Sequence, residues 1–198
     1  MEVKHMTTDI RVKKTRRTII QTFLNLLGKI PFKKITVAKI YTEAEIAKST
    51  FYDHFKDKYD LLDQIIQSLS EDFAFEIKQK FSEFNTETIL ESLTNIFLNL
   101  SKNPDALNAL LDLHETPITL EFRLRQITFE VCKDYLLRQD LNSQFSIDFL
   151  AHFYSELSLT SIRFALNNAA NPDWVQQQTE LMGMLQQELR AKITSDQL

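Results

Sequence analysis

The sequence predicts an all-α protein, and three features of its composition and patterning support this prediction. Glycine and proline are scarce, with two and four residues in a chain of 198. The stretches between them are rich in Leu, Ile, Phe, Lys, Glu and Gln, and their apolar residues recur at steps of three and four. No alternating run of β-branched residues competes with this pattern. We therefore expect about nine helices joined by short loops.

A first helix is predicted from about residue 9 to residue 29, after a loose tail at residues 1–9. Ile19, Phe23 and Leu27 lie on one face of it, and Pro31 follows its end. The start of this helix is basic, and two explanations stay open for its cations. They reach DNA phosphates or a minor groove, or they only keep this end of the chain soluble. These cations are Arg11, Lys13, Lys14, Arg16 and Arg17.

Two short helices follow, at about residues 36–44 and 48–55. Thr36 is placed to cap the first of them, because a threonine hydroxyl can accept a hydrogen bond from a backbone N–H of the first turn. Ile40, Phe51 and Phe55 supply apolar contacts between the helices. The remaining side chains of the pair are polar or cationic, as in a helix-turn-helix, where one helix crosses the phosphate backbone and the next enters the major groove. They include Lys39, Lys48, Ser49, Thr50, Tyr52, His54 and Lys58.

Residues 49–62, which read STFYDHFKDKYDLL, resemble the recognition helix and the following turn of the TetR family of bacterial transcriptional regulators. Residues 32–40, FKKITVAKI, resemble the same family's entry into its second helix. The resemblance covers the first third of the chain. It implies a three-helix DNA-binding domain at residues 1–60, followed by a helical domain at residues 61–198 that binds an effector and dimerises.

The resemblance also implies roles for individual residues. Lys48 and Ser49 are expected at base edges, and Thr50 and Tyr52 at neighbouring phosphates. The remaining expected DNA contacts are Thr36, Lys39, His54 and Lys58 in the motif and Lys14 and Arg17 in the first helix. Asp57 is expected to cap the helix that Lys58 begins.

Three residues depart from the family's usual pattern. Glu45 stands where the turn usually has glycine, and Ala47 stands where a serine usually caps the recognition helix. Asp53 adds a carboxylate to that helix. An alternative function follows from these departures, in which the motif has lost DNA binding and serves as a protein-interaction or co-regulator module.

The charge of the chain is unevenly distributed. Residues 1–62 hold thirteen Lys and Arg against seven Asp and Glu, whereas residues 63–198 hold ten against twenty. A basic amino-terminal third on an acidic body places the attraction for a polyanion at the helix-turn-helix. Double-stranded operator DNA is therefore the expected partner.

Further helices are predicted at about residues 58–81, 89–100, 103–113 and 116–137, the last opening on Thr116 as a cap before Pro117. Arg125 falls on an apolar stripe of that helix. It either pairs with Glu121, one turn earlier, or faces a pocket that binds an anionic effector. Candidate residues of such an effector pocket are Phe97, Leu100, His114, Phe122, Arg125 and Phe129.

The last two helices are predicted at about residues 146–168 and 173–193. The first has a strip of small side chains, from Ala151 through Ser158 and Ser161 to Ala165, which allows another helix to approach closely. Such a pair resembles the family's dimer interface, and packing within the chain is the alternative. We expect a homodimer through these helices.

Several function classes are disfavoured by the sequence. It has no glycine-rich phosphate loop, no activated nucleophile motif and no clustered metal ligands, so an enzyme, a metal site or a cofactor is not expected. Cys132, the single cysteine, allows no internal disulfide, and no apolar run approaches the ~18 residues of a membrane span. The prediction is a cytoplasmic DNA-binding regulator. The favoured form is a repressor that binds a near-palindromic operator as a dimer and is released by a small-molecule effector.

Overall fold

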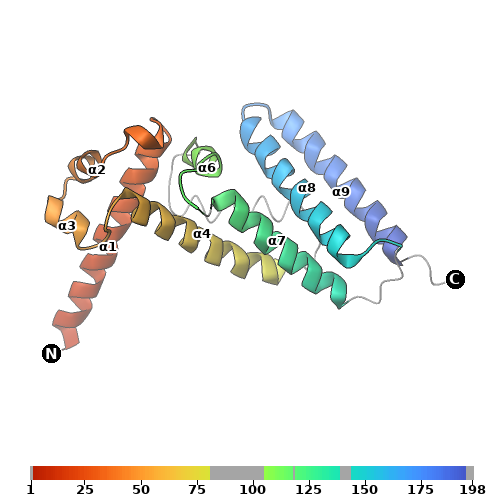
Figure 1. Ribbon diagram of the computed structural model, residues 1–198, viewed down its shortest axis with the longest axis horizontal. Coiled ribbons are helices and arrows are strands. Elements are labelled where there is room, and N and C mark those ends of the chain that lie inside the picture. The colour runs from red at the N-terminus through yellow and green to blue at the C-terminus, as the bar shows by residue number, and fades with distance from the viewer. Residues whose placement is uncertain (1, 81–104, 118, 139–143, 195–198) are drawn as a thin grey trace. The chain divides into compact units, whose positions relative to one another are not determined.

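The computed structural model describes residues 2–80, 105–117, 119–138 and 144–194 of the chain. Within these ranges it contains eight α-helices, one short 3-10 helix and no β-strand, so the predicted all-α fold is confirmed (Figure 1). The elements are α1 (Glu2–Leu27), η1 (Phe32–Lys34), α2 (Val37–Glu43), α3 (Lys48–Tyr52), α4 (Lys58–Lys80), α6 (Asp105–Leu111), α7 (Leu120–Leu137), α8 (Ile147–Asn167) and α9 (Pro172–Thr194).

The chain forms two compact units, and the first comprises the described residues among 1–68 and 97–119. Its core is built on the face of α1 that carries Ile19, Phe23 and Leu27, which recur every four residues and are buried. Ile40 of α2 and Phe51 of α3 are fully buried in the same unit. Helices α2 and α6 both pack against α1, and α3 packs against α2 (Figure 1).

The second unit comprises the described residues among 69–96 and 120–198. Helices α7 and α8 lie side by side along their length, and α9 packs on α8 (Figure 1). The strip of small side chains predicted on α8 is buried within the chain, from Ala151 through Ser158 and Ser161 to Ala165. The Ser158 and Ser161 hydroxyls donate to the carbonyls of Tyr154 and Leu157, so their polar groups are satisfied inside the helix. Close packing within the chain therefore accounts for this strip.

The only cysteine, Cys132, lies in α7 and is completely buried. Burial in apolar surroundings disfavours the thiolate and raises the pKa of the thiol to about 12. Its thiol therefore stays protonated at neutral pH.

Two predicted helix boundaries are wrong. The expected loose tail at residues 1–9 is helical from Glu2, because neither glycine nor proline interrupts the helix on that side. Helix α7 begins at Leu120 and not at Pro117, since the chain bends at residues 115–117 and Thr116 is buried there. A residue before proline, here Thr116, favours an extended backbone, which suits a bend better than the start of a helix. The predicted helix at residues 89–100 lies outside the described residues.

In the described ranges, no helix combines the length and the apolar character that crossing a bilayer requires.

Candidate nucleic-acid interface

Helix α2 begins where the sequence predicts. The Thr36 hydroxyl accepts a hydrogen bond from the Lys39 backbone N–H at 3.2 Å, and Thr36 has the extended backbone typical of a cap residue. Ile40 points into the core, whereas Thr36 and Lys39 are exposed. The first turn of α2 therefore offers an exposed cation at the surface of the first unit.

The turn between α2 and α3 forces Glu45 into a left-handed conformation, with a φ of 53°. The Ile46 N–H donates to the Tyr41 carbonyl at 3.0 Å, and the Glu45 N–H donates to the Thr42 carbonyl at 3.2 Å. These two bonds form a Schellman motif, whose left-handed position usually has glycine. The expected strain at Glu45 is present, and a non-glycine residue there costs on the order of 1 kcal/mol.

Helix α3 is only five residues long and starts without a side-chain cap at Ala47. Phe51 and, just after the helix, Phe55 are buried, and this fixes which face is left outside. Lys48 and Ser49 are exposed, and Tyr52 is 49% exposed with its ring edge against Phe51. Lys48, Ser49 and Tyr52 thus share the outer face of α3, with Thr50 half-buried beside them.

Beyond α3, Asp57 caps α4 as predicted. Its carboxylate oxygen Oδ1 accepts the backbone N–H groups of Tyr59 at 2.7 Å and Asp60 at 2.9 Å. His54 is half-buried, with its ring 6.2 Å from that of Phe55.

Lys58 differs from the other predicted DNA contacts because its half-buried ammonium group is bonded to backbone carbonyls. Nζ donates to the carbonyl oxygens of Phe32 at 3.0 Å and Ile35 at 2.9 Å. It also lies 4.3 Å from the centroid of the Phe32 ring. The phosphate contact at Lys58 stays a prediction, and sequence reasoning missed these internal bonds.

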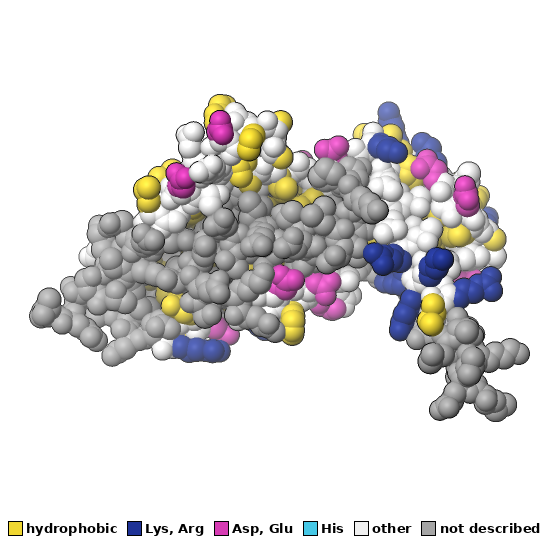
Figure 2. All heavy atoms as spheres, turned by 180° about the vertical axis from the view of Figure 1, so that it is seen from behind, with side chains coloured by type: hydrophobic (Ala, Val, Ile, Leu, Met, Phe, Trp, Pro, Cys, Tyr) yellow, Lys and Arg dark blue, Asp and Glu magenta, His cyan; other side chains and the backbone are white. Residues whose placement is uncertain are grey.

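The cations of α1 lie in the same unit as α2 and α3. Arg11, Lys13, Lys14 and Arg17 are exposed, and the first completely buried side chain described along the helix is Ile19. Arg16 instead stacks on the Phe55 ring at 4.8 Å. Dark-blue Lys and Arg side chains gather over this unit in Figure 2. The first unit therefore presents a basic surface, as the uneven charge of the sequence predicts.

Of the predicted effector residues, the described ones that share a compact unit are those of α7. Phe97 and Leu100 lie outside the described residues. His114 is exposed and belongs to the first unit, whereas Phe122, Arg125 and Phe129 belong to α7 in the second. Phe122, expected on an apolar stripe, is 44% exposed, and Phe129 stacks on the ring of His152 at 4.3 Å. The effector pocket stays a prediction.

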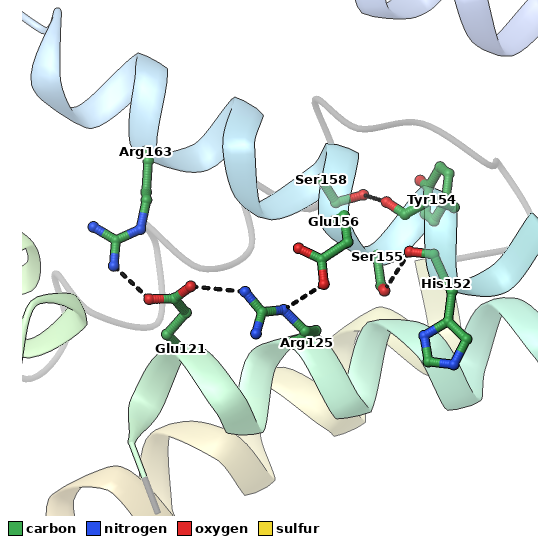
Figure 3. Close-up of polar contacts among 8 residues, drawn as sticks. All are labelled: Glu121, Arg125, His152, Tyr154, Ser155, Glu156, Ser158 and Arg163. Atoms are coloured by element: carbon green, nitrogen blue, oxygen red, sulfur yellow. Dashed lines mark hydrogen bonds and ion pairs between the residues drawn. The ribbon is translucent and has the colours of Figure 1, made fainter. Parts of the chain in front are cut away.

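Arg125 has the internal partner that the sequence favours. Its Nη2 donates to Glu121 Oε1 at 2.8 Å, and its Nε lies 2.9 Å from Glu156 Oε1 of α8, in an ion pair without a well-directed hydrogen bond (Figure 3). The other Glu121 oxygen accepts from Arg163 of α8. This charge network joins α7 to α8 and leaves Arg125 neutralised.

No group of three or more His, Cys, Asp or Glu side chains that could hold a metal ion occurs among the described residues.

Comparison with known proteins identifies the domain that contains α2 and α3. Residues 19–65 match the model of the bacterial regulatory proteins of the tetR family. The amino-terminal domain of the chain is therefore similar to the DNA-binding domain of the TetR family. The matched model describes regulatory proteins, which agrees with the prediction that the chain is not an enzyme.

A curated relative is also a helix-turn-helix regulator. The chain is 30% identical over 104 residues to the HTH-type transcriptional regulator YxbF of Bacillus subtilis (strain 168), a match that takes in 51% of this chain and 27% of the relative. The chain thus spans about a quarter of that relative's length.

Solved structures show the same fold at low sequence identity. The dihydroxyacetone kinase operon activator DhaS is 18% identical, with a TM-score of 0.58 over 90% of this chain and 96% of its own. The TetR-family protein CprB from Streptomyces coelicolor, solved in complex with its operator sequence, is 20% identical, with a TM-score of 0.54 over 90% and 99% of the two chains.

A further feature that sequence reasoning missed is an aromatic row at the start of α8, formed by Phe145 just before the helix and by Phe149 and Phe153 within it. The three side chains are between 48% and 52% exposed, and successive rings stack at centroid distances of 5.7 and 6.1 Å. Their spacing of four residues is visible in the sequence. The small residues of α8 favoured a different face of the helix as the interface.

Proposed function

We propose that the chain is a transcriptional regulator that binds operator DNA as a homodimer. Residues 1–60 form its DNA-binding domain, called the reader below, and residues 61–198 dimerise and bind the effector. The observation that carries the proposal is the exposed face of α2 and α3. It presents Lys39, Lys48, Ser49 and Tyr52 on a basic unit, while Ile40 of α2 and Phe51 of α3 are buried. A helix-turn-helix requires this arrangement, in which apolar side chains hold the helices together and polar ones face the DNA.

Within this reader, the exposed residues take two roles. Lys48 and Ser49, at the start of α3, contact base edges in the major groove. Tyr52, Lys39, Lys14 and Arg17 contact phosphates and set the position of the reader on the duplex. Thr36, Thr50 and His54 complete the contacts at its edge. The DNA–protein complex of the related fold in CprB supports this use of the domain.

The aromatic row supports the homodimer. Trp174 and Leu181 of α9 are also more than half exposed, so the two last helices both present large apolar side chains outside the chain. Surfaces of this kind mark interaction sites on soluble proteins, and a two-fold symmetric pair buries the same surface on both subunits. We place the interface on this aromatic row and not on the small residues of α8, which are buried already.

Release by a small-molecule effector, and repression as the direction of control, follow from the resemblance to the family. The half-exposed Phe122 and Phe129 of α7 are the described residues that support an apolar effector site. Regulation in the opposite direction occurs on the same fold, since DhaS is described as an operon activator.

One alternative function has structural support. Glu45 is strained, Ala47 leaves α3 without a cap, and Asp53 places an exposed carboxylate next to α3. A reader weakened in this way would serve as a protein-interaction or co-regulator module.

Selection from a pool of random double-stranded DNA distinguishes the two functions. The proposed regulator retains near-palindromic fragments whose half-sites lie about one helical turn (~34–36 Å), or a multiple, apart, and loses them steeply as salt is raised. Ser49→Ala changes the preferred bases, whereas Lys39→Ala weakens binding to all sequences alike. Retention of unrelated fragments only would favour the interaction module.

A further inference from the structure

Lys58 joins three segments of the first unit. As the first residue of α4, it reaches back to η1 and donates to the carbonyl oxygens of Phe32 and Ile35, at 3.0 and 2.9 Å. Ile35 directly precedes Thr36, the residue that caps α2. One ammonium group therefore connects the start of α4 to the start of α2.

The aromatic surroundings of the ammonium reinforce this connection. The Phe32 ring, which is 3% exposed, lies 4.3 Å from Nζ, and the Tyr59 ring lies 5.4 Å from it. Phe32 also packs edge to face against Phe23 of α1 and against Tyr59. A cation held over an aromatic face and bonded to two carbonyls in a half-buried site is more strongly fixed than one in water.

The bonds to the two carbonyls determine which role the ammonium has. An ammonium group has three donors, and two of them point to Phe32 and Ile35. Lys39, in contrast, is exposed in the first turn of α2 and has its side chain in solvent. The two lysines belong to the same small domain, but only Lys58 is built into it.

We propose that Lys58 is a positioning residue of the DNA reader, which fixes the entry of α2 against the first turn of α4. This inference rests on the proposed function, since positioning has its effect through operator binding. Helix α4 contributes residues to both compact units. The hydrogen bonds of Lys58, its first residue, tie this helix to the segment that leads into α2 and α3. Loss of the tie lowers operator affinity without removing a phosphate contact.

The test compares Lys58→Met, which keeps the length of the side chain but has no donor, with Lys39→Met, which removes an exposed cation. Without DNA, amide hydrogen exchange at residues 35–40 becomes faster in Lys58→Met and stays as in the parent in Lys39→Met. With the selected operator, Lys58→Met binds about tenfold more weakly at every salt concentration, so that the salt slope is unchanged. In Lys39→Met the slope decreases by about 1.

Lys58→Gln provides a second variant should Lys58→Met fail to fold. Its amide keeps a donor but no charge, so exchange at residues 35–40 lies between those of the parent and the methionine variant, and the salt slope stays that of the parent. A slope lowered by about 1 in either variant, or unchanged exchange in both, would overturn the positioning role. If the parent selects no operator, the proposed function fails, while the exchange experiment still tests the tie.

Discussion

Glu45 is the residue whose backbone conformation conflicts most with its chemistry. Its φ of 53° lies in the region that glycine adopts freely and other L-residues adopt at a cost of roughly 1–2 kcal/mol. The two hydrogen bonds of the Schellman motif hold it there. Its exposed carboxylate also lies next to the helix that we propose reads DNA.

Glu45→Gly should raise the free energy of unfolding by up to about 1 kcal/mol, because it removes the left-handed strain. The matched control is Glu43→Gly, the same substitution at the last residue of α2, where the backbone is helical. That change should lower stability by up to about 1 kcal/mol, since glycine is a poor helix former. Urea unfolding of both variants measures the difference, and equal destabilisation would show that Glu45 is unstrained.

Combination with Ala47→Ser extends this prediction to function. A serine hydroxyl at residue 47 can accept an N–H of the first turn of α3, which contributes about 1 kcal/mol to its order. The double variant Glu45→Gly/Ala47→Ser should bind the selected operator more tightly with the same base preference. In an interaction module, only sequence-independent binding would increase. Competition between labelled operator and random DNA separates the two results.

Asp60 and Asp63 differ in the direction in which folding shifts their pKa values. Hydrogen bonds from the Gln64 side chain and the Lys56 backbone N–H lower the pKa of Asp60. Partial desolvation, together with the nearby carboxylates of Asp60 and Asp57, raises the pKa of Asp63, although its side chain is exposed. The charged form of Asp60 therefore stabilises the fold above its unfolded pKa, near 4, whereas the charged form of Asp63 destabilises it there.

Asp60→Asn should therefore lower the melting temperature at pH 7, and Asp63→Asn should leave it unchanged or raise it. Both differences from the parent should shrink below about pH 4. Asp60 loses its stabilising charge as the pH falls through its lowered pKa, and Asp63 is already protonated there. Thermal unfolding between pH 3 and pH 7 measures this, and a loss from Asp60→Asn that persists at pH 3 would contradict it.

At the scale of the helices, Glu121 is the shared partner in the network that joins α7 to α8. It pairs with Arg125 of its own helix and Arg163 of the other, with 19% of its side chain exposed. Arg125→Met leaves Glu121 bonded to Arg163, so it should cost less than about 1 kcal/mol. Glu121→Gln weakens both pairs and should cost more, about 1–2 kcal/mol.

Urea unfolding of the two variants checks the order of these costs. Thermal shift with anionic and neutral metabolites should give the same response in the parent and in Arg125→Met, because the guanidinium is neutralised inside the network. An anion that stabilises the parent but not the variant would show instead that Arg125 takes part in effector binding.

The sequence predicts the helices well and individual side-chain directions less well. The caps predicted at Thr36 and Asp57 are both present, at the starts of α2 and α4. The start of α7 could not be predicted, because Thr116 and Pro117 fit a bend as well as a cap. The direction of Lys58 depends on carbonyls 23 and 26 residues away, which no local pattern reports.

At the scale of the whole molecule, the proposed dimer interface on the aromatic row can be tested by introducing charge. Phe149→Lys together with Phe153→Lys places like charges opposite one another in a two-fold interface, and should convert the dimer to a monomer. Sedimentation measures this, and operator binding should weaken with it. Phe75→Lys, at a 66% exposed phenylalanine of α4, is the control and should leave the dimer intact. A double variant that still sediments as a dimer would place the interface elsewhere.

The burial of Cys132 makes the chain almost inert to maleimides while it is folded. Its thiol is inaccessible and has a pKa of about 12, so a cysteine introduced on an exposed helix can be labelled selectively in the native protein. Fluorophores attached in this way would report the distance between the two units with and without DNA. The native thiol itself would react only when the packing around α7 opens. The rate of its modification would measure how often this part of the second unit opens by local unfolding.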